Sequence, residues 1–174
     1  MTARRRIRRR RPRASRPRMP EYGIVGARSG RGLLPWRWAR QRLERAHTYW
    51  LATSRPDGRP HAMPVWGIWL DDRFYFSTGR KSRKARNLAA DPRCVVAAEQ
   101  KRESVIVEGV AAEVTDAAEM RRAGVPYKSK YKYALDPSLG PIFAVRPRVV
   151  FGFIDRGQEF VRTATRWRFA SRRR

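Results

Sequence analysis

Residues 48–78 read TYWLATSRPDGRPHAMPVWGIWLDDRFYFST, and their pattern gives the first indication of the fold. It contains three apolar segments with the two-residue period of β-strands, at 48–53, 61–70 and 73–78. An Asp-Gly pair separates the first two segments and an Asp-Asp pair separates the last two, and such pairs favour tight turns. The stretch is therefore predicted to form three consecutive antiparallel strands.

Segments of the same kind recur along the rest of the chain. Further strands are expected at 94–99, 104–114, 141–145, 149–154 and 159–169. Helices are expected at 35–47, at 82–91 and, after an N-cap at Thr115, at 115–124 and 125–135. The helices do not alternate with the strands as they do in a parallel βαβ sheet. The predicted fold class is therefore mainly β (α+β), an antiparallel barrel of six to seven strands with peripheral helices.

The net charge of the 174-residue chain, +26, is concentrated at its start. Residues 1–18 contain ten arginines and no acidic residue, so this arm is expected to be disordered and to bind nucleic acid nonspecifically. An address signal and an extension without a selected role are the alternatives, with Met19 as an alternative natural start. A lead-in and helix at 19–47, a barrel domain at 48–170 and a basic tail at 171–174 complete the predicted organisation.

The composition excludes several classes of protein. A single cysteine, Cys94, excludes an intramolecular disulfide and a cysteine-cluster metal site, and its apolar neighbours predict a buried thiol. No apolar run approaches the roughly 18 residues of a membrane span, and no apolar export segment follows the arginines. A cytoplasmic protein is therefore expected. No catalytic Ser-His or Cys-His arrangement is evident, and the only histidines are His47 and His61. His61 is expected to be structural or on the surface, with acid catalysis as the alternative.

A dense group of cations joins the third strand to the next predicted helix. Residues 78–88 read TGRKSRKARNL, with hydroxyl groups and a glycine among the charges. A helix that begins near Ser82 would direct free N–H groups and the positive end of its dipole to the same place. The stretch therefore predicts a site for one phosphate group, with a solvated basic helix start as the alternative. The residues concerned are Ser77, Thr78, Gly79, Arg80, Lys81, Ser82, Arg83, Lys84 and Arg86.

The second strand is expected to be an edge strand or to be interrupted, because Pro64 cannot donate to a sheet ladder. An interruption frees backbone groups that can bind the edge of a flat heteroaromatic ring, and Trp66 can stack on such a ring. Plain core packing is the alternative for the tryptophans and is the preferred interpretation for Trp69.

The pieces LAT, DGRPH, PVW, FST, SRKARNL and DPR follow one another across residues 49–99. Their order and spacing resemble the split β-barrel flavin- and deazaflavin-binding family typified by pyridoxamine 5′-phosphate oxidase. The resemblance implies a split barrel and a cofactor phosphate held by Ser82, Arg83 and Lys84. It places Ser77 and Thr78 beside the phosphate and makes Lys81 an additional phosphate or tail contact. The residues that it implies along the cofactor ring are Met63, Pro64, Val65 and Trp66.

The resemblance also implies an activity. The oxidase has an arginine and a lysine where this chain has Met63 and Ile68, and this departure favours the deazaflavin coenzyme F420 over FMN. The expected enzyme is a homodimer with a shared active site that transfers a hydride from reduced F420 to a C=C or C=N bond of a small organic substrate. The alternatives are an FMN-dependent oxidase-like enzyme, a haem- or tetrapyrrole-handling member of the fold, and a nucleic-acid-binding basic protein.

Overall fold

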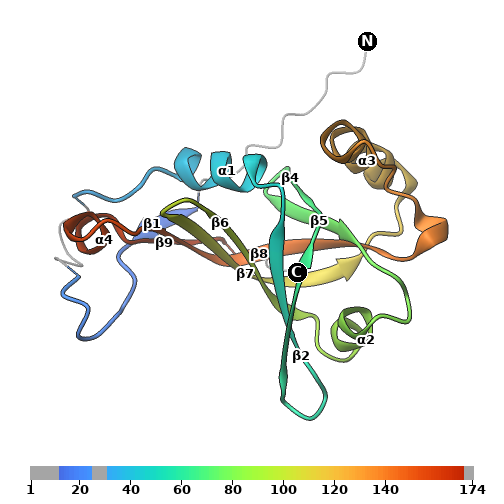
Figure 1. Ribbon diagram of the computed structural model, residues 1–174, viewed down its shortest axis with the longest axis horizontal. Coiled ribbons are helices and arrows are strands. Elements are labelled where there is room, and N and C mark those ends of the chain that lie inside the picture. The colour runs from blue at the N-terminus through green and yellow to red at the C-terminus, as the bar shows by residue number, and fades with distance from the viewer. Residues whose placement is uncertain (1–11, 25–30, 171–174) are drawn as a thin grey trace.

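The computed structural model describes residues 12–24 and 31–170. Within them, nine strands form one antiparallel sheet in the order β1-β9-β8-β7-β6-β2-β3, and the β4–β5 hairpin joins it through β8 (Figure 1). The strands are β1 (Arg13–Ser15), β2 (Tyr49–Ser54), β3 (Pro60–Val65), β4 (Ile68–Leu70), β5 (Arg73–Ser77), β6 (Arg93–Gln100), β7 (Glu103–Glu113), β8 (Ile142–Ile154) and β9 (Thr165–Arg168). The helices are α1 (Trp36–Arg45), α2 (Arg83–Ala90), α3 (Ala117–Tyr131), the 3-10 turn η1 (Pro137–Leu139) and α4 (Gln158–Thr163). The predicted mainly β, antiparallel fold with peripheral helices is confirmed, with nine strands in the described residues in place of the predicted six to seven.

The stretch 48–78 folds as predicted except that its middle strand is divided. β2 and β3 form a hairpin in which Tyr49 pairs with Val65, and Gly58 turns the chain with φ of +82°. β3 ends the sheet and pairs only with β2, which satisfies the restriction that Pro64 imposes. The chain then leaves the ladder at Trp66-Gly67 before β4 begins, so both predicted consequences of the proline, edge position and interruption, occur here.

The late strands differ from the prediction in length: β8 is longer than predicted and β9 is shorter. β8 is one strand of 13 residues instead of two, because Pro147 lies opposite Gly109 at a β-bulge, where a missing N–H donor is tolerated. The predicted strand at 159–169 is wrong in its first half, which forms α4 after Gly157 turns the chain with φ of +44°. In α4, Phe160 stacks on Phe153 of β8 at 5.5 Å, so tertiary packing outweighs the alternating pattern.

Helix α3 is also longer than the two predicted segments. It runs without a break through Pro126, and its N-cap is Asp116 rather than Thr115. The carboxylate of Asp116 accepts a hydrogen bond from the Ala118 N–H at 2.7 Å, a stronger cap interaction than a hydroxyl offers. None of the helices in the described part of the chain is long and apolar enough to span a membrane.

The arginine-rich arm is not disordered throughout, which corrects the prediction for part of residues 1–18. β1 pairs with β9, with Arg13 opposite Arg168. The buried guanidinium of Arg16 donates to the carbonyls of Ala164, at 3.0 Å, and of Arg162. A buried cation bonded to backbone carbonyls fixes this part of the chain against the sheet edge. Residues 1–11, on which most of the prediction falls, lie outside the described residues.

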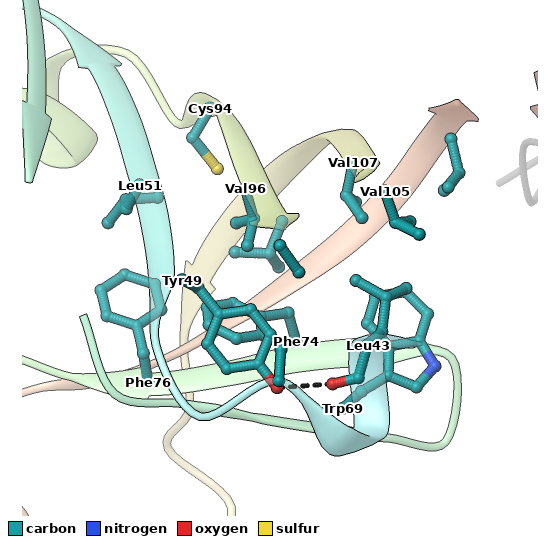
Figure 2. Packing of buried hydrophobic residues seen from close by; sticks show 14 of the residues in the cluster. Leu43, Tyr49, Leu51, Trp69, Phe74, Phe76, Cys94, Val96, Val105 and Val107 are labelled. Atoms are coloured by element: carbon teal, nitrogen blue, oxygen red, sulfur yellow. Dashed lines mark hydrogen bonds between the residues drawn. The ribbon is translucent and has the colours of Figure 1, made fainter. Parts of the chain in front are cut away.

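Two apolar clusters fill the structure. In the larger cluster, α1 packs Ala39 and Leu43 against the sheet, and the Tyr49 hydroxyl donates to the Leu43 carbonyl (Figure 2). Trp69 and Cys94 are buried in this cluster, so the predictions of a core tryptophan and a buried thiol are confirmed. The smaller cluster lies between α3 and the strands β4, β5 and β8 and comprises Ile68, Tyr75, Val114, Ala123, Tyr127, Tyr131, Ile142 and Ala144. The candidate site lies where α2, α3 and the broken β3–β4 strand meet.

Candidate functional site

The start of α2 has the geometry expected of an anion site. Ser82 is its N-cap, with extended backbone angles, and its Oγ accepts a hydrogen bond from the Ala85 N–H at 3.3 Å. The Thr78 hydroxyl lies 3.0 Å from the same oxygen, so the end of β5 is tied to the start of the helix. The first backbone N–H groups of a helix have no partner within it and carry a partial positive charge. The loop 78–82 therefore presents hydroxyl and N–H donors together.

A cavity of about 360 Å³ extends from this helix start to the break between β3 and β4. Its lining joins side chains from β3, β5, α2 and α3, which are separated in the sequence by as many as 79 positions (48 to 127). The lining residues are Thr48, Pro64, Val65, Trp66, Ser77, Thr78, Lys84 and Tyr127. Of the predicted site residues, Pro64, Val65, Trp66, Ser77, Thr78 and Lys84 are thus brought together in one cavity.

The other predicted site residues do not line this cavity. Ser82 acts as the helix cap, and Lys81 and Arg83 are exposed at the same helix start. Met63 is exposed on β3, opposite Leu51 in the ladder. These residues surround the cavity without contributing to its walls.

The β2–β3 hairpin adds further positive charge beside the start of α2. His61 of β3 has a lowered pKa, first because of partial burial and then because Arg55, Lys84 and Arg83 repel a proton on its ring. Among the described residues, buried polar atoms of this region without a hydrogen-bond partner include His61 Nδ1 and Arg55 Nε. Asp57, the nearby carboxylate, is exposed and paired with Arg59 at 2.7 Å. The region therefore has more cations than carboxylates and contains polar atoms without a partner. A bound anion would balance the charge and accept hydrogen bonds there.

The opposite wall of the cavity comes from α3 and was not assigned to the site from the sequence. Tyr127 lines the cavity, and Tyr131, one helical turn later, stacks on Trp66 with ring centroids 4.9 Å apart and planes at 8°. From the sequence, packing is the preferred interpretation for Tyr127, Tyr131 and Tyr133, with a position facing the substrate as the alternative, and Tyr127 and Tyr131 are in fact buried. The signal that the sequence offers is the spacing of four residues between these two, which puts both on one face of the helix. Thr48 is the other lining residue that was not assigned to the site, and no sequence pattern around it indicated a role there.

This donor set fits a small cofactor with one phosphate group and one flat ring system. Hydroxyls, helix N–H groups and Lys84 form the end of the cavity that suits an anion. Pro64, Val65 and Trp66 form an apolar wall that includes the backbone of an edge strand. Among the described residues no group of three or more His, Cys, Asp or Glu is placed to hold a metal ion. Redox or group-transfer chemistry at such a site would depend on the bound organic cofactor.

Comparison with known proteins agrees with this description. A family described as pyridoxamine 5′-phosphate oxidase matches residues 37–153. None of the curated proteins matches the chain. A conserved hypothetical protein from Mycobacterium tuberculosis is 27% identical, with a TM-score of 0.61 over 75% of this chain and 91% of that chain.

Two further solved structures share the fold at lower identity. One, described as an F420 reductase, is 24% identical, with a TM-score of 0.54 over 63% of this chain and 93% of the other. A FAD-binding protein from Mesorhizobium loti is 19% identical, with a TM-score of 0.54 over 79% of this chain and 96% of the other.

Proposed function

The chain belongs to the pyridoxamine 5′-phosphate oxidase family, whose split barrel binds flavins and deazaflavins, and from this membership we propose that it is a coenzyme F420-dependent reductase. When bound, the reduced deazaflavin would supply a hydride for a C=C or C=N bond of a small organic substrate. The observation that carries the proposal is the single cavity that joins the anion-binding start of α2 to the Pro64–Trp66 wall.

The residues of this chain would bind and orient the cofactor. Lys84, the hydroxyls of Ser77 and Thr78 and the first N–H groups of α2 would hold its phosphate, and the exposed Lys81 and Arg83 would add charge beside it. Ser82 would fix the helix start as its cap. The strand segment from Met63 to Trp66 would lie along the ring.

The environment of Ile68 favours F420 over FMN. In the oxidase pattern a lysine closes the strand motif where this chain has Ile68. Here that side chain is 4% exposed and packs in the smaller apolar cluster with Tyr75 and Ala144. An ammonium group at this position would be buried without an ionic partner, so this chain is built without the cation that the oxidase places there.

A titration tests the proposal directly. The binding constants of F420 and FMN are measured by fluorescence on the wild type, on Lys84→Ala and on Arg86→Ala. F420 is expected to bind more tightly than FMN, and Lys84→Ala is expected to raise its Kd by about 10- to 100-fold, the usual range for one charge-assisted phosphate contact.

Arg86→Ala is the matched control, because residues two apart on a helix face different directions and the net charge changes equally. A Kd that rises equally in both variants would reduce the effect to general electrostatics. An F420 Kd that Lys84→Ala leaves unchanged would remove the phosphate assignment, and tighter binding of FMN would overturn the choice of cofactor.

We further propose that a second copy of the chain completes the site. One row across the sheet runs Pro64, Trp50, Ala97, Ile106 and Phe151 through successive registers. Trp50 is 55% exposed in this row, and its ladder partner Pro64 lines the cavity. A partner that covers Trp50 would therefore reach the edge of the site.

The oligomeric state tests this part of the proposal. Light scattering is expected to give a dimer for the wild type and a monomer for Trp50→Glu, with a loss of F420 affinity in the monomer. A dimeric Trp50→Glu variant would show that this row is not the interface.

A further inference from the structure

The peptide of Gly67 is held by side chains of α3 instead of by a neighbouring strand. Gly67 lies in the break between β3 and β4, where no ladder partner is available to its N–H and carbonyl groups. The residue itself is confined, because a Cβ here would lie 2.2 Å from the Phe74 ring and 2.7 Å from the Tyr75 carbonyl oxygen. A buried peptide in this position requires other hydrogen-bond partners.

Tyr131 supplies one set of partners. Its hydroxyl oxygen accepts from the Gly67 N–H at 2.9 Å and lies within donating distance of two carbonyls, those of Gly67 at 2.8 Å and His47 at 2.7 Å. A phenol has one proton, so it can satisfy only one of the two carbonyls at a time.

Lys130 supplies a second donor, so the Gly67 and His47 carbonyls need not share the one Tyr131 proton. Its Nζ donates to the Gly67 carbonyl and to the Tyr49 hydroxyl, both at 2.9 Å, and the Tyr49 hydroxyl in turn donates to the Leu43 carbonyl. With Lys130 bonded to Gly67, the Tyr131 proton is free for the His47 carbonyl. The three carbonyls, the Gly67 N–H and the two tyrosine hydroxyls are then satisfied by one consistent direction of donation.

The same residues determine where Trp66 lies. The Trp66 indole is 46% exposed and stacks on the Tyr131 ring, whose hydroxyl binds the next peptide along the chain. Tyr131 therefore contacts both the ring of Trp66 and the backbone that follows it. The position of Trp66 in the wall of the cavity therefore depends on α3.

We propose that Tyr131 and Lys130 are positioning residues that hold the Gly67 peptide and the Trp66 indole in the arrangement that receives the cofactor ring. The proposal rests on the proposed function for the identity of the ring, but not for the contacts. It makes the affinity for the ring depend on a helix that contributes nothing to the phosphate end.

The charge of Lys130 makes the arrangement sensitive to pH. Burial lowers the pKa of Lys130 to about 8. The groups that face its Nζ are the ring and hydroxyl of Tyr49, the ring of Tyr131 and the Gly67 carbonyl. Glu44 of α1 in turn raises the pKa of Tyr49. No carboxylate of the described residues pairs with Lys130, so its ammonium loses a proton near that pH. The neutral amine keeps two N–H donors but loses the positive charge that strengthens its hydrogen bond to the Gly67 carbonyl.

The first experiment follows Trp66 without any cofactor. The protein is labelled with 5-fluorotryptophan, and the Trp66→Phe variant identifies the resonance of Trp66. In the wild type this resonance is expected to shift with a midpoint near pH 8, and in Lys130→Met the shift is expected to be absent. Lys128→Met, an exposed lysine on the same helix, is the matched control and is expected to keep the shift. A shift that persists in Lys130→Met would overturn the proposal.

The second experiment measures F420 affinity. Tyr131→Phe keeps the stacked ring but leaves the Gly67 N–H without its acceptor, and is expected to raise the Kd about fivefold to tenfold. Tyr133→Phe is its control, because Tyr133 is 52% exposed and touches Trp66 only edge-on at 6.5 Å. A Kd for Tyr131→Phe within twofold of the wild type would refute the positioning role and leave the cofactor assignment intact.

The two proposals fail in different ways. If the wild type binds neither F420 nor FMN, the proposed function is wrong, whereas the fluorine shift at pH 8 and its loss in Lys130→Met still support the role of α3. If Tyr131→Phe does not fold, Lys130→Met carries the test, since methionine replaces the buried ammonium by an apolar chain of similar length.

Discussion

The two ends of the candidate site are built in different ways. The proposed anion-binding end is local: Ser77, Thr78, Ser82 and Lys84 lie within eight residues, and one strand end and one helix cap position them. The ring wall is nonlocal, because the peptide of Gly67 is fixed by a helix 64 residues later in the chain. The local end could be recognised from sequence, and the nonlocal end depends on how α3 packs.

Substitution of a glycine at each end should show the largest difference between them. Gly67→Ala would place a methyl group 2.2 Å from the Phe74 ring and is expected to lower the free energy of unfolding by about 3 kcal/mol. Gly79→Ala, beside the start of α2, meets no atom within 4 Å and is expected to change it by less than about 0.5 kcal/mol. Urea denaturation of both variants measures the two values. Equal stabilities would show that the break at Gly67 is as adaptable as the loop.

Removal of the arm should separate stability from binding at either end. β1 lies at the opposite edge of the sheet from β3, so a chain that starts at Met19 loses the β1–β9 pairing and the Arg16 contacts but no cavity residue. The free energy of unfolding is expected to fall by about 2 kcal/mol, with the F420 Kd unchanged.

A shorter deletion of residues 1–11 is the control and should leave both quantities unchanged, because β1 and Arg16 remain. Nonspecific RNA binding is expected to weaken in both deletions, with a lower salt dependence, since both remove cations. A loss of F420 affinity in either deletion would show that the arm contributes to the site.

The smallest expected effect is a titration at the anion-binding end. Partial burial and the cations Arg55, Lys84 and Arg83 lower the pKa of His61. A bound phosphate offsets those cations and favours the charged imidazolium, so the pKa of His61 is expected to rise when F420 binds. NMR titration of the His61 ring with and without F420 measures it. A pKa that stays the same at saturation would place the phosphate elsewhere.

Much of the fold could be predicted because its signals are local. The Asp57-Gly58 turn, the restriction at Pro64 and the start of a helix near Ser82 each depend on a few neighbouring residues and were interpreted correctly. The failures occurred where distant contacts decide. Pro147 lies between the two strands predicted at 141–145 and 149–154, but a bulge opposite Gly109 accommodates it within one strand. β1 forms because β9 offers an open edge.

In the candidate site, too, the residues that local sequence indicates were identified and those that depend on distant contacts were not. Lys84, Thr78 and Trp66, which the pattern and the family resemblance assign to a cofactor site, line one cavity. Their roles toward a cofactor stay predictions. Tyr127 lines the cavity, and Tyr131 and Lys130 bind Gly67, but none of the three was assigned to the site. The spacing of the two tyrosines indicates that they share a face of α3, and nothing in the sequence indicates that this face packs on the β3–β4 break.

The central claim is that one bound cofactor contacts both ends of the site, and amide chemical-shift mapping with F420 tests it most directly. The account predicts that F420 shifts the amide signals of Arg83 and Lys84 at the start of α2 and also those of Val65, Trp66 and Gly67 at the broken strand, while signals of β1 and β9 stay in place. Shifts confined to α2, or none at either end, would contradict it.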